Sequence, residues 1–435
     1  MTKRFVLLGQ TLGYVADPFH VPAAEAARHD THGAVVVEDG RIVDVGPAGA
    51  ITRAYPETPP FDYGDALITA GFVDAHAHYP QTRMIASWGK RLIDWLNHYT
   101  FPEELKFADA AYARETAELY LDLLLAHGTT SVASFCTVHP ESVTAFFEAA
   151  QARDMRVVAG KTCMDRHAPE GLTDSAQLGY DESKVLLERW HGAGRLIYAI
   201  TPRFSPTSTA EQLEALGALW AEYPDCPMQT HLSEQPDEVA WVSELFPHTE
   251  DYLHSYEVHG LLGPGAMFGH GIHLTDRERD AIRDHDAGLI HCPTSNTFIG
   301  SGLFSTKDLA DEKHRIGLAT DTGGGSSFSM LRTMASAYEL GQLRGTPLHP
   351  SQLYWLATQG SARTLRAEHQ IGNLAPGMEA DLVVLDLAST PAIAQRAARA
   401  DDIWEALFPT IMMGDDRAVK ATWVAGKPVK LSIGM

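Results

Sequence analysis

The stretch Gly71-Phe-Val-Asp-Ala-His-Ala-His78 places two histidines two residues apart, directly after an apolar, β-rich run from Ala66 to Val73. On a strand, residues two apart point to the same face, so His76 and His78 can turn both imidazoles toward one metal ion. A helix would need a spacing of four residues for the same pair. The chain has 21 histidines, so the interpretation depends on whether later strands supply further ligands.

The composition describes a folded protein with an acidic surface. The chain has 435 residues, of which 45% are hydrophobic, enough for a large core and an accessory domain. A formal charge of −22 argues against a nucleic-acid partner or an anionic membrane surface, since both select for basic patches. The four cysteines show no CxxC spacing, which is typical of buried thiols in a reducing compartment.

No segment reads as a targeting or membrane sequence. The apolar run within Met1–Gln10 is too short and too soon interrupted for a signal peptide, and no later window is long enough to span a bilayer. We therefore expect a cytoplasmic protein.

Both ends of the chain are rich in strand patterns. Near the amino terminus, apolar runs at 33–38 and 41–46 flank Asp39-Gly40, a strong hairpin signal. Similar runs recur at 379–386 and 419–429 near the carboxyl terminus. Each set is too small to bury a core alone, so we expect both to combine into one small β-sandwich domain, built from residues 1–69 and 371–435.

Between them, at 70–370, short apolar runs alternate with helical patterns. Counting the opening run through Val73, eight strand candidates occur, the others at 129–135, 156–162, 196–201, 226–231, 266–270, 288–291 and 316–321. Helical patterns lie at 107–125, 140–153, 181–190, 209–223 and 275–285. Eight βα alternations predict an α/β fold, a TIM-like (β/α)8 barrel. The alternative, an open doubly wound sheet, lacks support because no G-x-G-x-x-G follows an early strand.

Polar residues end several of these runs. Active groups in barrels sit at the carboxyl ends of the strands, and the residues found there are His76, His78, Arg203, His231, His270 and Asp321. Imidazoles with one carboxylate suit Zn²⁺ or another borderline divalent ion such as Fe²⁺, with a position left for water. Such an ion lowers the pKa of its water from about 15.7 toward about 7, so hydrolysis is the expected chemistry.

Two further residues fit that chemistry. Glu234 follows His231 by three residues, at the start of a helical pattern, and can shuttle protons as a general acid and base. Its alternative role is a helix-start carboxylate favoured by the helix dipole. His270 can hold the attacking water or polarise the attacked bond. The fourth strand supplies no bridging lysine or carboxylate, so we expect one metal ion per chain.

Other motifs are incomplete. His139-Pro-Glu141 lacks the P-C-x-x-C partner of the nucleobase deaminase signature. Gly160-Lys-Thr162 lacks the preceding glycine of a P-loop. The run Gly323–Gly325 after Asp321 is interpreted as a turn that lets backbone approach the site. The loop at 80–106, after the first barrel strand, is long and is expected to carry substrate contacts.

The motifs together resemble the amidohydrolase superfamily over nearly the whole chain. The resemblance rests on 71–78, Thr230-His-Leu-Ser-Glu234, His291-Cys-Pro-Thr-Ser-Asn296, Ala319-Thr-Asp321 and 377–384. More narrowly, the chain is similar to the members that deaminate guanine, through the motifs His78-Tyr-Pro-Gln81, 95–102, 160–165, Thr201-Pro-Arg-Phe-Ser205 and 300–304.

The resemblance implies a (β/α)8 barrel enzyme that converts guanine to xanthine and ammonia in purine metabolism. It implies the metal ligands His76, His78, His231 and Asp321. It implies Glu234 as proton shuttle, with His270 and Asp321 holding the hydroxide, and Gln81, Arg203, Phe204 and His270 at the purine. It also suggests a homodimer. Two alternatives stay open: an aminohydrolase of another purine, pterin or triazine, and a metal-free scaffold protein on the same fold.

Overall fold

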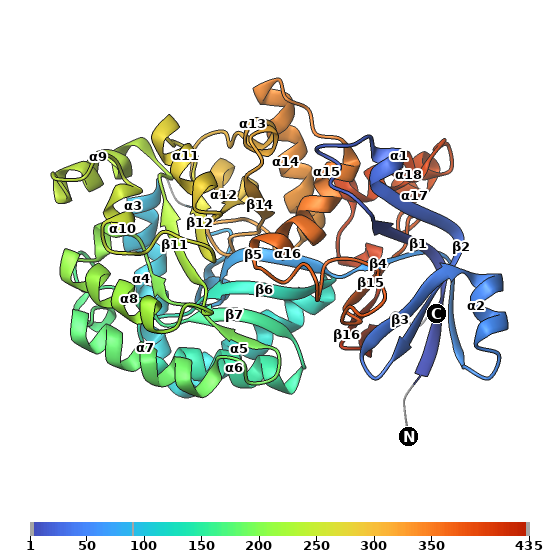
Figure 1. The fold of residues 1–435 in the computed structure, drawn as a ribbon, viewed down its shortest axis with the longest axis horizontal. Coiled ribbons are helices and arrows are strands. Elements are labelled where there is room, and N and C mark those ends of the chain that lie inside the picture. The colour runs from blue at the N-terminus through green and yellow to red at the C-terminus, as the bar shows by residue number, and fades with distance from the viewer. Residues whose placement is uncertain (1–3, 89–90, 432–435) are drawn as a thin grey trace. The chain divides into compact units, whose positions relative to one another are not determined.

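The computed structural model describes residues 4–88 and 91–431, which divide into two compact units (Figure 1). The first contains residues 4–74, 122–131 and 328–431. The second contains residues 75–121 and 132–327, without 89–90. The division at 1–69, 70–370 and 371–435 expected from the sequence stays a prediction.

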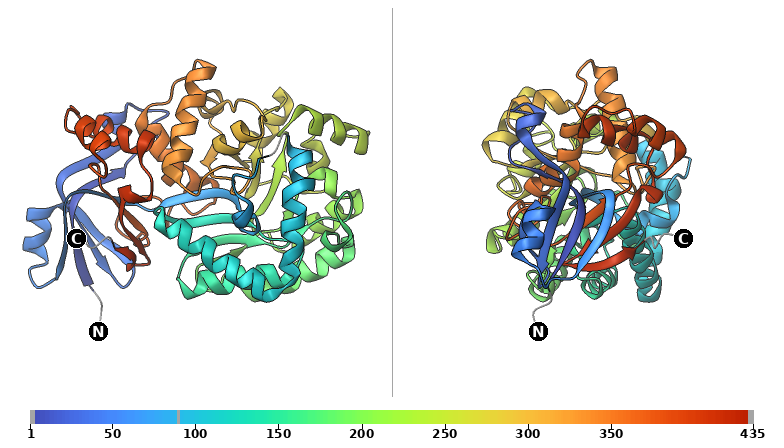
Figure 2. Two further views of the ribbon diagram at one scale, coloured as in Figure 1. Left: turned by 180° about the vertical axis from the view of Figure 1, so that it is seen from behind. Right: turned by 90° about the vertical axis from the view of Figure 1, so that its right-hand side faces the viewer.

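The first unit is organised around a seven-stranded sheet in the order β17-β16-β15-β4-β1-β2-β3. Its strands are β1 (Arg4–Tyr14), β2 (Ala27–Glu38), β3 (Arg41–Pro47), β4 (Pro60–Ala70), β15 (Leu382–Leu385), β16 (Val419–Val424) and β17 (Lys427–Leu431). Strand β4 from the amino-terminal part pairs with β15 from the carboxyl-terminal part, and the blue and red strands lie side by side in Figure 2. Strands from both chain ends therefore share one sheet, while the sandwich arrangement stays a prediction.

The predicted hairpin is present in this sheet. Asp39 and Gly40 join β2 to β3 with φ angles of 48° and 82°. Two consecutive positive φ angles are the requirement of a type I′ turn, which matches the twist of the flanking strands. The Asp-Gly signal therefore led to the correct turn.

Both faces of β2 are covered. Val35 and Val37 pack in a cluster with Trp423, whereas Ala34 and Val36 pack in another with Ile51 of helix α2 (Ala48–Ala54). Successive strand residues point to opposite faces. The unbroken apolar run at 34–37 thus reflects burial on two sides.

The eight predicted barrel strands are all found. They are β5 (Phe72–His78), β6 (Thr129–Phe135), β7 (Arg156–Gly160), β9 (Leu196–Tyr198), β11 (Met228–Leu232), β12 (Ala266–His270), β13 (Gly288–His291) and β14 (Arg315–Leu318). They form two four-stranded sheets, β5-β6-β7-β9 and β11-β12-β13-β14. The short strands β8 (Thr162–Cys163) and β10 (Thr201–Pro202) pair beside them.

Backbone contacts join the two sheets into a closed barrel. A parallel bridge between Ile200 and Met228 links the first sheet to the second. On the other side, Asp321 N donates to His76 O at 3.0 Å, and His78 N donates to Thr322 O at 2.6 Å. The predicted (β/α)8 barrel is confirmed.

One expectation about the first barrel strand was wrong. The apolar run from Ala66 to Val73 is not a single strand, because Ala66–Ala70 ends β4 of the seven-stranded sheet and β5 begins at Phe72. Gly71 lies between them, and a Cβ there would be 2.3 Å from Thr130 Oγ1. The chain can change sheets at this point because glycine allows that close approach.

Helices cover the outside of the barrel strands (Figure 1). The predicted helical patterns correspond to α5 (Ala110–Ala126), α6 (Pro140–Ala152), α7 (Ala176–Trp190), α8 (Ala210–Glu222) and α11 (Asp276–Asp284). The other helices are α1 (Ala23–Ala26), α3 (Leu92–Trp95), α4 (Phe101–Glu104), α9 (Pro236–Leu245), α10 (His254–Glu257), α12 (Pro293–Phe298), α13 (Thr306–Asp311), α14 (Met330–Arg344), α15 (Pro350–Trp355), α16 (Ser361–Thr364), α17 (Pro391–Ala397) and α18 (Ile403–Met413). Within residues 4–88 and 91–431, none of these is both long and apolar enough to cross a membrane.

Candidate active site

The polar residues that end the strands converge at one end of the barrel. His76 and His78 are on β5, His231 is on β11, His270 ends β12, and Asp321 follows β14. All five lie in the second unit. Four of them are buried, and His231 is half-buried. The predicted strand-end positions thus lie together in space.

The backbone bends sharply at two of these positions. His270 and Asp321 have φ angles of 70° and 47°, in the left-handed region that residues with a side chain rarely adopt. Such backbone strain is typical of functional sites, where the surrounding structure maintains it. Here it turns the chain at the last residue of β12 and three residues beyond β14.

Three histidines present their ring nitrogens to one another. His78 Nε2 lies 3.1 Å from His231 Nε2, and donor atoms of His76, His78 and His231 lie within 4.8 Å of one another. His231 Nδ1 is 2.6 Å from the carbonyl oxygen of Arg203, so its N–H donates there and leaves the lone pair on Nε2. Burial, followed by the nearby His76, holds the pKa values of His78 and His231 well below the usual range. These imidazoles are therefore neutral, which is the form that binds metals.

Asp321 supplies the carboxylate to this group. Its Oδ1 lies 3.5 Å from His76 Nε2 and 3.4 Å from His78 Nε2, and its Oδ2 lies 3.7 Å from His270 Nε2. Burial raises the pKa of Asp321, but the hydrogen bond and charge of His76 and the charge of His270 outweigh it, giving about 2. The ionised carboxylate and the imidazoles form the donor set preferred by Zn²⁺ and similar ions. The residues therefore fit a divalent metal ion.

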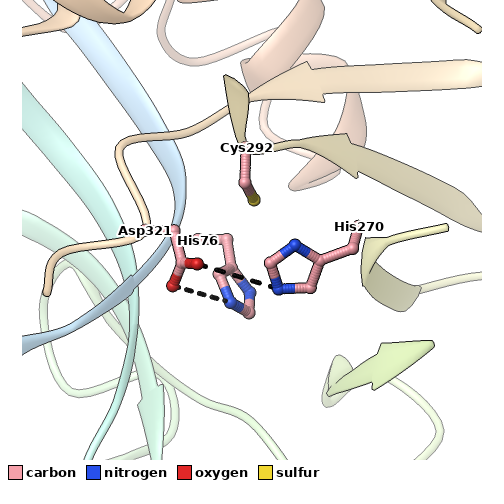
Figure 3. Close-up of side chains that lie close together, drawn as sticks. All are labelled: His76, His270, Cys292 and Asp321. Atoms are coloured by element: carbon pink, nitrogen blue, oxygen red, sulfur yellow. Dashed lines mark ion pairs between the residues drawn. The ribbon is translucent and has the colours of Figure 1, made fainter. Parts of the chain in front are cut away.

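Cys292, directly after β13, also points toward this group (Figure 3). Its thiol lies within 4.8 Å of donor atoms of His76, His270 and Asp321. From its sequence, Cys292 was expected only to be a buried thiol. Its place in the motif 291–296 was the available signal that it lies near the site.

Glu234 and His270 form a pair beside the metal-ligand candidates. His270 Nε2 lies 3.5 Å from Glu234 Oε2, and Ser301 Oγ donates to Glu234 Oε1 at 2.9 Å. Burial raises the pKa of Glu234 to about 7, against the lowering effect of His270. Burial lowers the pKa of His270, but the negative charges of Glu234 and Asp321 outweigh it and raise it overall. Glu234 can thus hold or release a proton near neutral pH.

The helical position expected for Glu234 was wrong. Helix α9 begins at Pro236 with Gln235 as its N-cap, so Glu234 lies before the helix. The capping box is formed by Gln235, whose side chain accepts from the backbone of Glu238, and by Glu238, whose Oε2 accepts from Gln235 N at 3.1 Å and from Glu234 N at 2.9 Å. Glu234 is therefore free of the capping role and its side chain faces the pocket.

Most of these groups line one pocket. Its polar lining contains Gln81, Arg203, His78, His231, Glu234, His270 and Asp321, and its apolar lining contains Leu92, Trp95, Leu96, Phe204 and Ile299. The three predicted substrate contacts, Gln81, Arg203 and Phe204, are among these residues. Phe204 also packs in an apolar cluster with Trp95 and Leu96, so it is both core and pocket wall.

The loop at 80–106 contributes part of the pocket lining, while its expected contacts with substrate stay a prediction. Gln81 and the residues of α3 belong to it, while Gly89 and Lys90 lie outside the described residues. From the opposite side, Gly323 N donates to Gln81 Oε1 at 3.2 Å. A Cβ on Gly323 would be 2.7 Å from the carbonyl oxygen of Gln81. The glycine run thus permits the close backbone approach that was predicted.

Two residues near the pocket were missed by sequence reasoning. Glu104, on α4, accepts hydrogen bonds from both Gln81 and Arg203. Asn296 Oδ1 lies 3.0 Å from His270 Nδ1. Asn296 ends a motif that was recognised, whereas nothing in the local sequence distinguishes Glu104 from its neighbour Glu103.

Known proteins match this chain over most of its length. The model of the "Amidohydrolase family" matches residues 67–429, and that of an "Imidazolonepropionase-like composite domain, bacteria" matches residues 33–57. Guanine deaminase of Escherichia coli (strain K12) is 42% identical over 407 residues, covering 93% of each chain.

Solved structures match it in the same way. The structure of the E. coli guanine deaminase has a TM-score of 0.96 at 41% identity and covers 98% of this chain and 99% of its own. A guanine deaminase from C. acetobutylicum with guanine bound in the active site has a TM-score of 0.88 at 27% identity, with coverage of 98% and 100%.

Proposed function

This chain belongs to the amidohydrolase family, and we propose that it is a guanine deaminase, which hydrolyses guanine to xanthine and ammonia. The observation that carries the proposal is a single pocket lined by Gln81, Arg203 and Phe204 together with the strand-end groups. The 42% identity to the E. coli guanine deaminase over 93% of both chains supports it.

The donor set that would hold the metal consists of His76, His78, His231 and Asp321. We propose one Zn²⁺ per chain, with Fe²⁺ as the alternative, because imidazole and carboxylate ligands accept both. When bound, the ion lowers the pKa of a water molecule toward about 7 and supplies a nucleophile at neutral pH.

Glu234 carries the proton transfers in this proposal. Its pKa of about 7 allows it to take a proton from water and to deliver it at neutral pH. Glu234 delivers the first proton to the purine ring nitrogen beside C2. It then takes the second proton from the new hydroxyl on C2 and passes it to the departing amine as the C2–N bond breaks and the C2 carbonyl forms. His270, 3.5 Å from Glu234 and 3.7 Å from Asp321, orients the attacking water between the two carboxylates.

The purine is held by the opposite part of the pocket. Arg203 presents a planar set of N–H donors suited to the O6 carbonyl of guanine. Gln81 can donate and accept at a purine edge. Phe204 supplies an apolar wall against the flat ring.

Two further proposals concern the protein in the cell. All four cysteines are free and buried, which supports a reducing compartment such as the cytoplasm. We also propose a homodimer, on the basis of the family resemblance.

The test is ammonia release from a panel of amino-substituted purines, pterins and triazines, by protein whose metal content has been measured. We expect release from guanine with an equal amount of xanthine. Activity confined to another ring, with metal present, would keep the family and overturn the roles given to Gln81 and Arg203. A protein without metal or activity would favour the scaffold alternative.

A further inference from the structure

One buried carboxylate holds two of the proposed substrate-binding residues. Glu104, on α4, is 1% exposed. Its Oε2 accepts from Arg203 Nη1 at 2.7 Å, and its Oε1 accepts from Gln81 Nε2 at 3.0 Å. The two oxygens of one carboxylate therefore bind two different residues of the pocket lining.

These contacts fix which way the Gln81 amide points. Its Nε2 faces Glu104, and its Oε1 accepts from the backbone N–H of Gly323 at 3.2 Å. A reversed amide would place its oxygen against the carboxylate of Glu104 and its NH₂ against the N–H of Gly323. The network thus leaves one N–H donor and one lone pair of Gln81 for a ligand, in a defined order.

Glu104 also balances the charge of Arg203. The two side chains are 1% and 4% exposed, so the solvent screens their interaction weakly. Phe101, on the same helical turn as Glu104, places its ring 5.6 Å from the Arg203 guanidinium. Arg203 and Glu104 therefore form an ion pair without net charge, and the remaining N–H donors of Arg203 stay available to the pocket.

We infer that Glu104 is a positioning and specificity-determining residue, which sets the donors of Arg203 and Gln81 for a neutral purine and disfavours an anionic one. This inference rests on the proposed function. Its importance comes from the product: xanthine has a second carbonyl beside its ring N–H groups, so it loses a proton more readily than guanine. Without the negative charge of Glu104, the positive charge of Arg203 would bind the xanthine anion more tightly.

The experiment compares three variants of the full-length, metal-loaded protein. Glu104→Gln removes the charge and replaces one acceptor by a donor. Glu104→Asp keeps the charge but shortens the reach. Glu103→Gln is the matched control, because Glu103 lies on the same helix and binds Lys106 at 2.6 Å and Tyr112 instead. Folding and metal content are measured for each.

For each protein, kcat and KM for guanine and inhibition by xanthine and hypoxanthine are measured at one mildly alkaline pH, where xanthine is largely ionised and hypoxanthine is neutral. We expect Glu104→Gln to lower kcat/KM by about 10- to 100-fold, because the donors are misplaced. It should also tighten xanthine inhibition about 3- to 10-fold, with little change for hypoxanthine. Glu104→Asp should lower kcat/KM while xanthine inhibition stays near wild type, and Glu103→Gln should resemble wild type.

Wild-type kinetics in Glu104→Gln would overturn the inference, as would an equal loss in Glu103→Gln or equal changes for both inhibitors. If Glu104→Gln does not fold, Glu104→Asp decides through kcat/KM: a value equal to wild type would overturn the positioning role. Failure of the proposed function is recognised separately, because the wild-type protein would not act on guanine. The variants would then be compared on whichever ring the wild type deaminates.

Discussion

The Nε2 atoms of His78 and His231 face each other at 3.1 Å, although the two residues lie on strands from opposite halves of the barrel. The Arg203 carbonyl fixes the ring of His231 through Nδ1. Burial lowers the pKa of both imidazoles, so neither carries a positive charge near neutral pH. The protein thus brings two neutral nitrogen ligands together on its own, which favours a cation between them.

Removal of one of these ligands should remove the metal. We expect His231→Asn to purify with far less than one metal ion per chain and to lose activity, because the remaining donors form an incomplete site. When the free metal concentration is 100 times the dissociation constant, binding stabilises the native state by about 2.7 kcal/mol. Chelation should therefore lower the thermal midpoint of the wild type and leave that of the variant unchanged. Elemental analysis and thermal denaturation measure both effects.

The control for this variant is His285→Asn, since His285 is an exposed histidine at the end of α11. Its metal content should equal that of the wild type. Full metal occupancy in His231→Asn would remove His231 from the ligand set.

Glu234→Gln should separate proton transfer from metal binding. Glutamine keeps the shape of Glu234 and can still form a hydrogen bond with Ser301, but its amide cannot take up and release a proton near neutral pH. We expect kcat to fall by about 10²- to 10⁴-fold, the usual contribution of a general acid and base. Metal content should stay at the wild-type level. The control is Glu244→Gln, at an exposed position, which should keep both the kcat and the metal content of the wild type. Loss of metal in Glu234→Gln would instead make Glu234 a ligand or the support of one.

The barrel and its strand-end groups could be predicted because their signals are local. Each strand is a short apolar run ended by a polar residue, and the carboxyl ends of parallel strands share one face. His231 and Asp321 could therefore be placed near His76 without knowledge of any contact. The same reasoning failed between Ala66 and Val73, because hydrophobic continuity does not show that the chain changes sheets at Gly71.

Glu104 could not be predicted for a different reason. It lies on a short helix within a long loop, and its partner Arg203 is 99 residues away. Glu103 and Glu104 are adjacent, chemically identical and both buried. Only the tertiary structure shows that one contacts the pocket residues and the other contacts Lys106.

The pairing of Arg203 with Glu104 should be measurable as a coupling in stability. Arg203→Met leaves Glu104 as a buried charge without its main partner, a situation that costs about 3–5 kcal/mol. Because Glu104→Gln removes that charge, we expect the double variant to be more stable than Arg203→Met alone. Denaturant unfolding of the wild type, both single variants and the double variant gives the coupling energy. Purely additive losses would mean that the pair contributes no net interaction.

Asn296 should control the orientation of His270. Its Oδ1 lies 3.0 Å from His270 Nδ1 and accepts a hydrogen bond there, which orients the ring so that Nε2 faces Glu234. We expect Asn296→Ala to lower kcat about 10- to 100-fold, as removal of such supporting partners usually does, while the proposed metal ligands stay occupied. Asn296→Asp keeps the acceptor and should recover part of that loss. The exposed neighbour Thr297 provides the control Thr297→Ala, which should keep wild-type kinetics. Equal activity in Asn296→Ala and the wild type would show that packing alone orients the imidazole, without a contribution from the hydrogen bond to Asn296.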